Sequence, residues 1–288
     1  MPAFPASMVL FAAALSAQTA QPVREVTSAL GTSYYSLPDE KGVVATARKN
    51  LAADPKNPDL LMKLEAAQVS VWQDREAVAT CTQALKVKPG DAAIYTERGH
   101  RELPLRNFKQ ALADLNQAAA LDPKKMDTYY HLGLVHYFLG EFPQAGEAFG
   151  HAVELAPDVD ERINSSNWLY ASLRRAHREA EAAQALARIT PEMTNTAEHT
   201  LFYLNLLRFF QGRLPEAGAL PSEPPAANAD NEAELRFDTV AYGVGNWHLY
   251  HNDAAKAQEY FAHILKGHVW VTWGFIGAEV EMVRARHK

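Results

Sequence analysis

The chain has 288 residues, of which 48% are hydrophobic and 22% are charged. This balance is typical of folded soluble proteins and excludes the disordered and fibrous classes. The net charge of −6, without a cluster of Lys or Arg, argues against a nucleic-acid partner, because phosphate neutralisation needs grouped basic side chains. The single cysteine, Cys81, rules out an intramolecular disulfide, so cysteine pairing says nothing about the compartment.

Residues 1–20 contain no Asp, Glu, Lys or Arg. An apolar run over residues 8–15 and mostly small residues up to Ala20 are typical of a secretory signal peptide, cleaved between about Ser16 and Ala20. The run is too short to cross a bilayer. We expect a periplasmic or secreted protein with no transmembrane segment after signal removal. No Lys or Arg precedes the apolar run, so the alternative of a frayed terminus on a cytoplasmic protein stays open.

Residues 21–41 form a separate N-terminal segment. Polar residues such as Thr27 and Ser28, followed by Pro38, disfavour a helix. We expect extended chain docked on the first repeat of the region that follows.

Residues 42–191 contain a sequence pattern that repeats every 34 residues. Five prolines mark it, each 34 residues after the last: Pro55, Pro89, Pro123, Pro157 and Pro191. Such a period indicates a helical repeat array. Each unit is predicted to be a helix, a tight turn and a second helix, and the pattern is clearest over residues 92–157.

The clearest unit shows how its two helices would pair. Tyr129, Leu132, Gly133 and His136 lie on one face of the first helix, and Ala145, Phe149 and Ala152 form the answering stripe on the second. Gly133 has no side chain, so the second helix can approach closely there. Gly140 permits the turn between the helices, and Pro157 ends the second helix.

These slots and their spacing resemble the tetratricopeptide repeat (TPR) family, most strongly over residues 58–157. The resemblance implies an all-α fold, a right-handed α-solenoid of helix pairs whose concave face binds a protein or peptide. It implies no catalytic activity.

Residues 192–288 depart from the period. Helices are expected at residues 198–211, 232–251, 254–266 and 269–286, with a Pro-rich loop at residues 221–228. Asp253 is a candidate N-cap. The last helix is expected to cap the final repeat, because terminal repeats must cover the exposed end of the core.

The residues that could be reactive or bind a metal are predicted to have structural roles. Cys81 falls on the buried stripe of its helix, so a core position is preferred over a reactive thiol. His248 and His251 lie three apart, but a metal site needs three or four converging ligands. The chain has no Gly-x-Ser-x-Gly, phosphate-binding Gly-rich loop or His-Glu-x-x-His sequence. We therefore predict no enzyme activity, no cofactor and no metal.

An aromatic stripe offset from the pairing face is the candidate binding site. Its members are Tyr130, Leu134, Tyr137, Phe138, Trp168, Phe202, Phe209, Tyr242 and Tyr250. They resemble the slots that line the groove of TPR proteins, and would take an apolar segment. The Lys and Asn residues with which some relatives hold a C-terminal carboxylate are replaced by Ala66, Thr96, His100 and Leu103. The equal alternative is that these rings are inter-repeat core.

Two functions stay open. The first is a protein- or peptide-binding scaffold, exported to the cell envelope. The alternative is a structural, self-assembling component of an envelope complex without a peptide groove.

Overall fold

The computed structural model describes residues 21–193, 197, 200–220 and 231–286. The N-terminal part forms strands β1 (Arg24–Thr27) and β2 (Ser33–Tyr35) and helix α1 (Val43–Ala53). The repeats form α2 (Pro58–Val69), α3 (Asp74–Val87), α4 (Ala92–Glu102), α5 (Phe108–Leu121), α6 (Met126–Leu139), α7 (Phe142–Leu155), α8 (Val159–Arg175) and α9 (Glu179–Ala187). The C-terminal part forms α10 (Leu201–Phe210), α11 (Glu216–Ala219), α12 (Asn231–Tyr250), α13 (Ala254–Ile264) and α14 (Trp273–Arg286). The expected signal peptide and Pro-rich loop lie outside the described residues.

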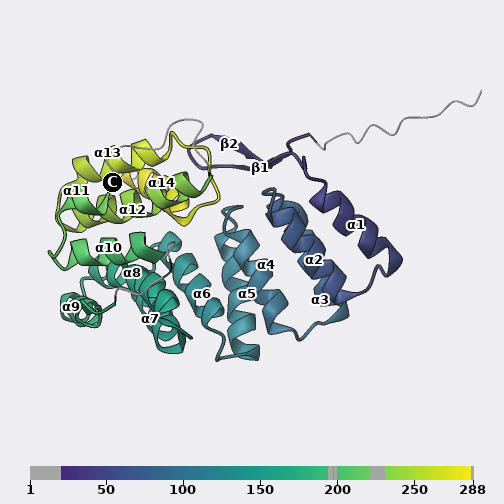
Figure 1. Ribbon diagram of the computed structural model, residues 1–288, viewed down its shortest axis with the longest axis horizontal. Helices are drawn as coiled ribbons and strands as arrows, with labels where there is room; N and C mark the ends of the chain where they lie inside the picture. Colours follow the sequence, from purple (N-terminus) through teal and green to yellow (C-terminus); the bar gives the residue numbers. More distant parts are fainter. Residues whose placement is uncertain (1–20, 194–196, 198–199, 221–230, 287–288) are drawn as a thin grey trace, which may run out of the picture.

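Successive helices stack side by side into a curved array, as Figure 1 shows from α1 to α10. The predicted close approach at Gly133 is confirmed, since a Cβ there would lie 2.7 Å from the ring of Phe149. Gly99 is in the same position against Leu115, again at 2.7 Å. Gly140 has a φ of 85°, the left-handed conformation expected at the turn. The all-α solenoid expected from the period is therefore confirmed.

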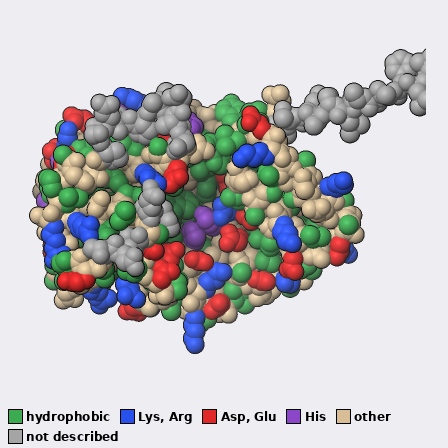
Figure 2. Space-filling view, viewed as in Figure 1, with side chains coloured by type: hydrophobic (Ala, Val, Ile, Leu, Met, Phe, Trp, Pro, Cys, Tyr) green, Lys and Arg blue, Asp and Glu red, His purple; other side chains and the backbone are tan. Residues whose placement is uncertain are grey.

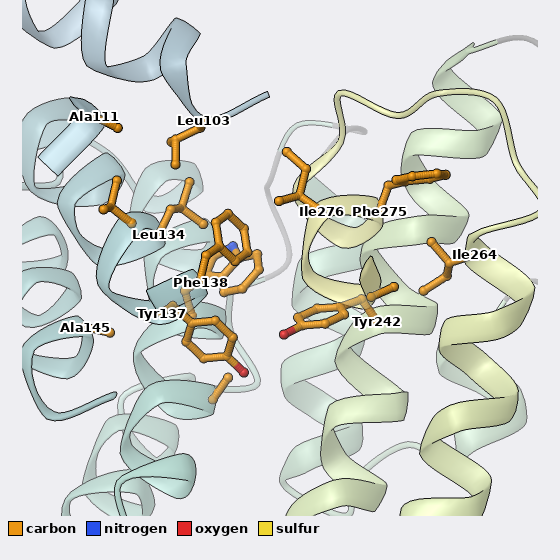
Figure 3. Close-up of a cluster of buried hydrophobic side chains, with 14 of the residues drawn as sticks. Leu103, Ala111, Leu134, Tyr137, Phe138, Ala145, Tyr242, Ile264, Phe275 and Ile276 are labelled. Carbon is orange, nitrogen blue, oxygen red and sulfur yellow. The ribbon is translucent and has the colours of Figure 1, made fainter. Parts of the chain in front are cut away.

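The C-terminal helices fold back against the inner side of the array. Tyr137 and Phe138 of α6 face Tyr242 of α12 and Phe275 of α14 across one continuous apolar core (Figure 3). Helix α14 also reaches α6 through Arg284, whose Nη2 donates to the carbonyl oxygens of Tyr137 (2.9 Å) and Phe138 (2.8 Å). The last helix therefore packs on α12 and α13, as a capping helix would, and on the middle of the repeats as well.

The segment expected to be extended forms an antiparallel β-hairpin. It docks on the first repeat, where the Leu37 amide donates to the Val71 carbonyl at 2.8 Å. It also lies beside the C-terminal helices (Figure 1).

Four side chains join the hairpin and the repeats to the C-terminal part, and we call them the clasp: Tyr34, Arg106, Trp270 and Glu279. Tyr34 stacks on Trp270 with ring centroids 5.6 Å apart, and its hydroxyl donates to Glu279 at 3.1 Å. Arg106 donates to both carboxylate oxygens of Glu279, at 3.3 and 3.1 Å. The clasp links residues up to 245 positions apart, so it closes the array into one body.

Candidate binding face between the repeats and the C-terminal helices

Most of the predicted aromatic stripe is buried by the chain's own C-terminal helices. Tyr137 and Leu134 have no exposed surface, and Phe138, Trp168, Tyr242 and Phe209 are also buried. The Tyr137 hydroxyl accepts a hydrogen bond from the Asn246 side chain of α12 at 2.6 Å. An open apolar groove is thus absent at these residues, because α12 and α14 cover them. This packing agrees with the core alternative, and partner contact by these side chains stays a prediction.

The other members of the stripe are half-buried and lie apart. Tyr130 packs against the main core, Phe202 packs with Phe209 and α12, and Tyr250 packs against Tyr170 of α8. The nine predicted residues are therefore shared among separate clusters and form no single lining.

A different surface remains open on this side of the molecule. Figure 2 shows a hollow between the repeats and the C-terminal helices, with histidine and charged side chains at its floor. We define the histidine face as Glu97, His100 and Arg101 of α4, His131 of α6 and Trp273 of α14. The two imidazole rings stack with centroids 4.0 Å apart, and Trp273 lies 5.3 Å from the ring of His100.

The neighbours of the two imidazoles fix their tautomers. Nδ1 of His131 lies 2.8 Å from the carbonyl oxygen of Asp127, which can only accept, so this nitrogen carries the proton. Nδ1 of His100 lies 2.6 Å from Nη2 of Arg101, which can only donate, so this nitrogen is bare and the proton is on Nε2. Burial, with the nearby Arg101 charge, lowers the pKa of His131 to about 3. Burial and the neighbouring His131 hold the pKa of His100 well below its usual value, so both rings are neutral at physiological pH.

Arg101 is neutralised by two carboxylates. Its Nε lies 3.2 Å from Glu65, and its Nη2 lies 3.2 Å from Glu97. Burial raises the pKa of Glu65 to about 7, while the Arg101 charge opposes the shift. The histidine face therefore presents little net positive charge and offers mainly neutral hydrogen-bonding groups.

Comparisons with known proteins agree with this architecture. A TPR repeat model matches residues 107–140, and a tetratricopeptide repeat model matches residues 127–159. Small glutamine-rich tetratricopeptide repeat-containing protein 2 of Saccharomyces cerevisiae is 25% identical over 138 residues, 48% of this chain and 38% of that protein. The chain is a tetratricopeptide repeat protein.

Other relatives share only the repeat region. A protein SGT1 homolog of Oryza sativa is 35% identical over 116 residues, 36% of this chain and 31% of that protein. Hsp70-Hsp90 organizing protein 2 of Arabidopsis thaliana is 26% identical over 126 residues, 42% of this chain and 22% of that protein. This TPR chain thus matches less than two fifths of each relative's length. A TPR protein from Parabacteroides merdae has 18% identity and a TM-score of 0.50 over 81% of this chain and 90% of its own, which shows the fold alone.

The TPR chain has a polar cavity of about 540 Å³ between β1 and the turn that joins α4 to α5. Its charged groups already have partners. The Arg75 amide donates to the Glu25 carboxylate at 2.8 Å, and the Asn107 side chain donates to Glu102 at 2.6 Å. Arg106 is held in the clasp. This cavity offers a ligand fewer free groups than the histidine face.

The histidine pair singled out in the sequence has structural partners. His248 contacts Glu216 at 3.1 Å, and Nδ1 of His251 donates to the Trp247 carbonyl at 2.7 Å. Asp253 caps α13 by accepting from the Lys256 amide, as expected. In the part of the chain that the structure describes, no group of three His, Cys, Asp or Glu side chains is placed to hold a metal. None of the described helices combines the length and apolar character needed to span a bilayer.

Sequence reasoning found only part of the histidine face. His100 was noted because it occupies a slot that binds ligand in some relatives. His131 belongs to no site predicted from the sequence, and Trp273 lies in the helix expected to cap the final repeat. Their proximity could have been predicted from the sequence, because His100 and His131 are 31 residues apart. This spacing is close to one repeat, so the two rings lie on the first helices of neighbouring repeats.

Proposed function

We propose that this TPR protein is a binding scaffold that holds a segment of a partner protein on the histidine face. One observation carries the proposal. The C-terminal helices cover the aromatic part of the inner side and leave a hollow with histidine and charged side chains (Figure 2). The histidine face keeps exposed surface, 23% of the side chain for His100 and 37% for Glu97. One relative, Hsp70-Hsp90 organizing protein 2, is named for organising two proteins, which supports binding as the role. The polar floor favours a polar segment over the apolar one expected from the aromatic stripe.

A peptide selection tests this proposal. The purified full chain is panned against a random peptide display library, and the affinity of recovered peptides is measured by fluorescence anisotropy. Glu97→Arg changes a half-exposed side chain on the histidine face and is expected to weaken binding at least tenfold. Glu154→Arg is the matched control, since Glu154 is 70% exposed on α7, which contributes no residue to that face. Equal affinity of the two variants, or failure to recover any binding peptide, would overturn the proposal.

We also propose that the protein is exported to the periplasm or secreted. The apolar run at residues 8–15 and the small residues after it support this. N-terminal sequencing of the native protein is expected to begin near Ala17 to Gln21. Intact Met1 on soluble cytoplasmic protein would refute export.

Sedimentation separates the scaffold from the alternative of a self-assembling envelope component. A monomer that binds peptide is expected. A defined oligomer without peptide affinity would favour the alternative.

A further inference from the structure

The two stacked imidazoles leave one donor and one acceptor unused. Because the proton of His100 is on Nε2, that atom is a donor, and because the proton of His131 is on Nδ1, its Nε2 is an acceptor. No side chain or backbone group of the described residues makes a hydrogen bond to either Nε2. The ring centroids lie 4.0 Å apart, so the two imidazoles form one small site.

This pair of atoms favours a ligand group that both accepts and donates a hydrogen bond. A carboxylate has only acceptors, so it would leave the lone pair on His131 unpaired and facing negative charge. An ammonium group has only donors, so it cannot use the proton on His100. A trans peptide group points its N–H and C=O in opposite directions and cannot serve both atoms with one edge. A primary amide carries a donor and an acceptor on the same edge.

We propose that the histidine face recognises the primary amide of an Asn or Gln side chain in the partner segment. The amide oxygen accepts from Nε2 of His100, and the amide nitrogen donates to Nε2 of His131. Trp273, whose ring lies 5.3 Å from His100 and 6.1 Å from His131, supplies a flat apolar wall for the methylene carbons of that side chain. This inference rests on the proposed function and names the group that the site selects.

The charge of the site agrees with a neutral ligand. Arg101 and Lys125 are the cations near His131, and the guanidinium of Arg101 is engaged by Glu65, Glu97 and the bare nitrogen of His100. A partner carboxylate would have to displace these contacts and would meet the negative charge of Glu97. A site built to hydrogen-bond both atoms of an amide therefore discriminates against its acid analogue.

Histidine-detected NMR tests the proposal on the full chain. In protein labelled with ¹⁵N-histidine, long-range spectra at pH 7.5 report the protonated nitrogen of each ring. The expected state is neutral, with the proton on Nε2 of His100 and on Nδ1 of His131. An imidazolium at either position, or the opposite tautomers, would overturn the inference without any ligand or variant.

Binding is then measured with two probes, N-acetyl-glutamine N-methylamide and N-acetyl-glutamate N-methylamide, which differ only at the side-chain group. Titration with the glutamine probe is expected to shift both Nε2 resonances. The glutamate probe is expected to bind about tenfold more weakly, because one hydrogen-bonding atom of the site is then left unpaired and the loss of such a hydrogen bond changes affinity by about this factor. His131→Phe and His100→Phe keep an aromatic ring and are each expected to abolish the preference. His151→Phe is the control, because His151 is 60% exposed on α7.

Equal binding of the two probes, or an unchanged preference in both face variants, would refute the inference. The outcome is separable from that of the scaffold proposal. If selected peptides bind at the histidine face without requiring Asn or Gln, the scaffold proposal is supported and the proposed recognition of a primary amide is refuted. Absence of any peptide binding would refute the scaffold itself.

Discussion

Substituting Glu279 by Gln tests whether the clasp holds the two ends of the chain together. The Glu279 carboxylate is 2% exposed and accepts from Arg106 at 3.3 and 3.1 Å and from the Tyr34 hydroxyl at 3.1 Å. Glu279→Gln removes the negative charge and leaves the guanidinium of Arg106, itself 10% exposed, without its counter-ion. Removing one partner of a buried pair costs about 3–5 kcal/mol. Because Gln keeps one acceptor, we expect a loss of about 3 kcal/mol in the free energy of unfolding.

Denaturation in urea, followed by tryptophan fluorescence, measures this loss, and Trp270 in the clasp reports on the same site. The control is Glu259→Gln, whose pair with Lys256 is exposed, so this substitution is expected to leave the stability nearly unchanged. The double variant Arg106→Met with Glu279→Leu removes both charges, and should recover most of the stability. A loss below about 1 kcal/mol for Glu279→Gln would show that the clasp is not formed in solution.

Three further predictions concern the core and the histidine face. Gly133→Ala should cost about 1–3 kcal/mol of stability, because the new Cβ would lie 2.7 Å from the Phe149 ring. In the same denaturation assay the control Gly150→Ala, with open space around it, should be neutral or slightly stabilising. Equal effects of the two substitutions would contradict the helix pairing. Cys81 is fully buried and burial raises the pKa of its thiol, so labelling by a thiol reagent should be slow until the fold is melted, and fast native labelling would place it outside the core. The folded-state pKa of His131, about 3, is below its unfolded value of 6.5, so its contribution to stability is present above pH 6.5 and is lost as the pH falls. Between pH 7.5 and 5 the wild type should therefore lose about 2 kcal/mol more than His131→Phe, and parallel stability curves would show that the ring is not held neutral.

The repeat architecture could be predicted because its information is local and periodic. Gly133 and Phe149 lie 16 residues apart in one unit, and the same pairing recurs one repeat earlier as Gly99 and Leu115. A small residue opposite a large one at a fixed spacing is sufficient to set the register of two adjacent helices. The structure reproduces that register directly.

The fold-back of the C-terminal helices could not be predicted, because its contacts have no period. From the sequence, Glu279 and Glu281 would be expected on the solvent-exposed side of the last helix, as most charged residues are. Both are buried, Glu279 with Arg106 and Glu281 with Arg175 at 2.9 Å. Glu281 also pairs with Arg284, three residues along the same helix, but Arg106 and Arg175 lie 173 and 106 positions away, so the sequence did not indicate these two long-range ion pairs.

The candidate site depends on the same fold-back. His100 and His131 come from neighbouring repeats, so their proximity follows from the period. Trp273 joins them from the last helix, 142 positions after His131, only because α14 reaches the inner side of the repeats. For the aromatic stripe the sequence left a groove and inter-repeat core as equal alternatives, because the helices that cover it, α12 and α14, come from a distant part of the chain.

Hydroxyl-radical footprinting of the full chain tests most directly whether the C-terminal helices cover the inner side of the repeats. Tyr137 is fully buried and Trp168 and Tyr242 nearly so, whereas Tyr35 is 50% exposed. The structure predicts rapid oxidation of Tyr35 and oxidation of the three buried rings at least tenfold more slowly, on the general ground that radicals reach only solvent-exposed side chains. Oxidation of Tyr137 and Trp168 at the rate of Tyr35 would contradict the fold-back and restore an open aromatic groove.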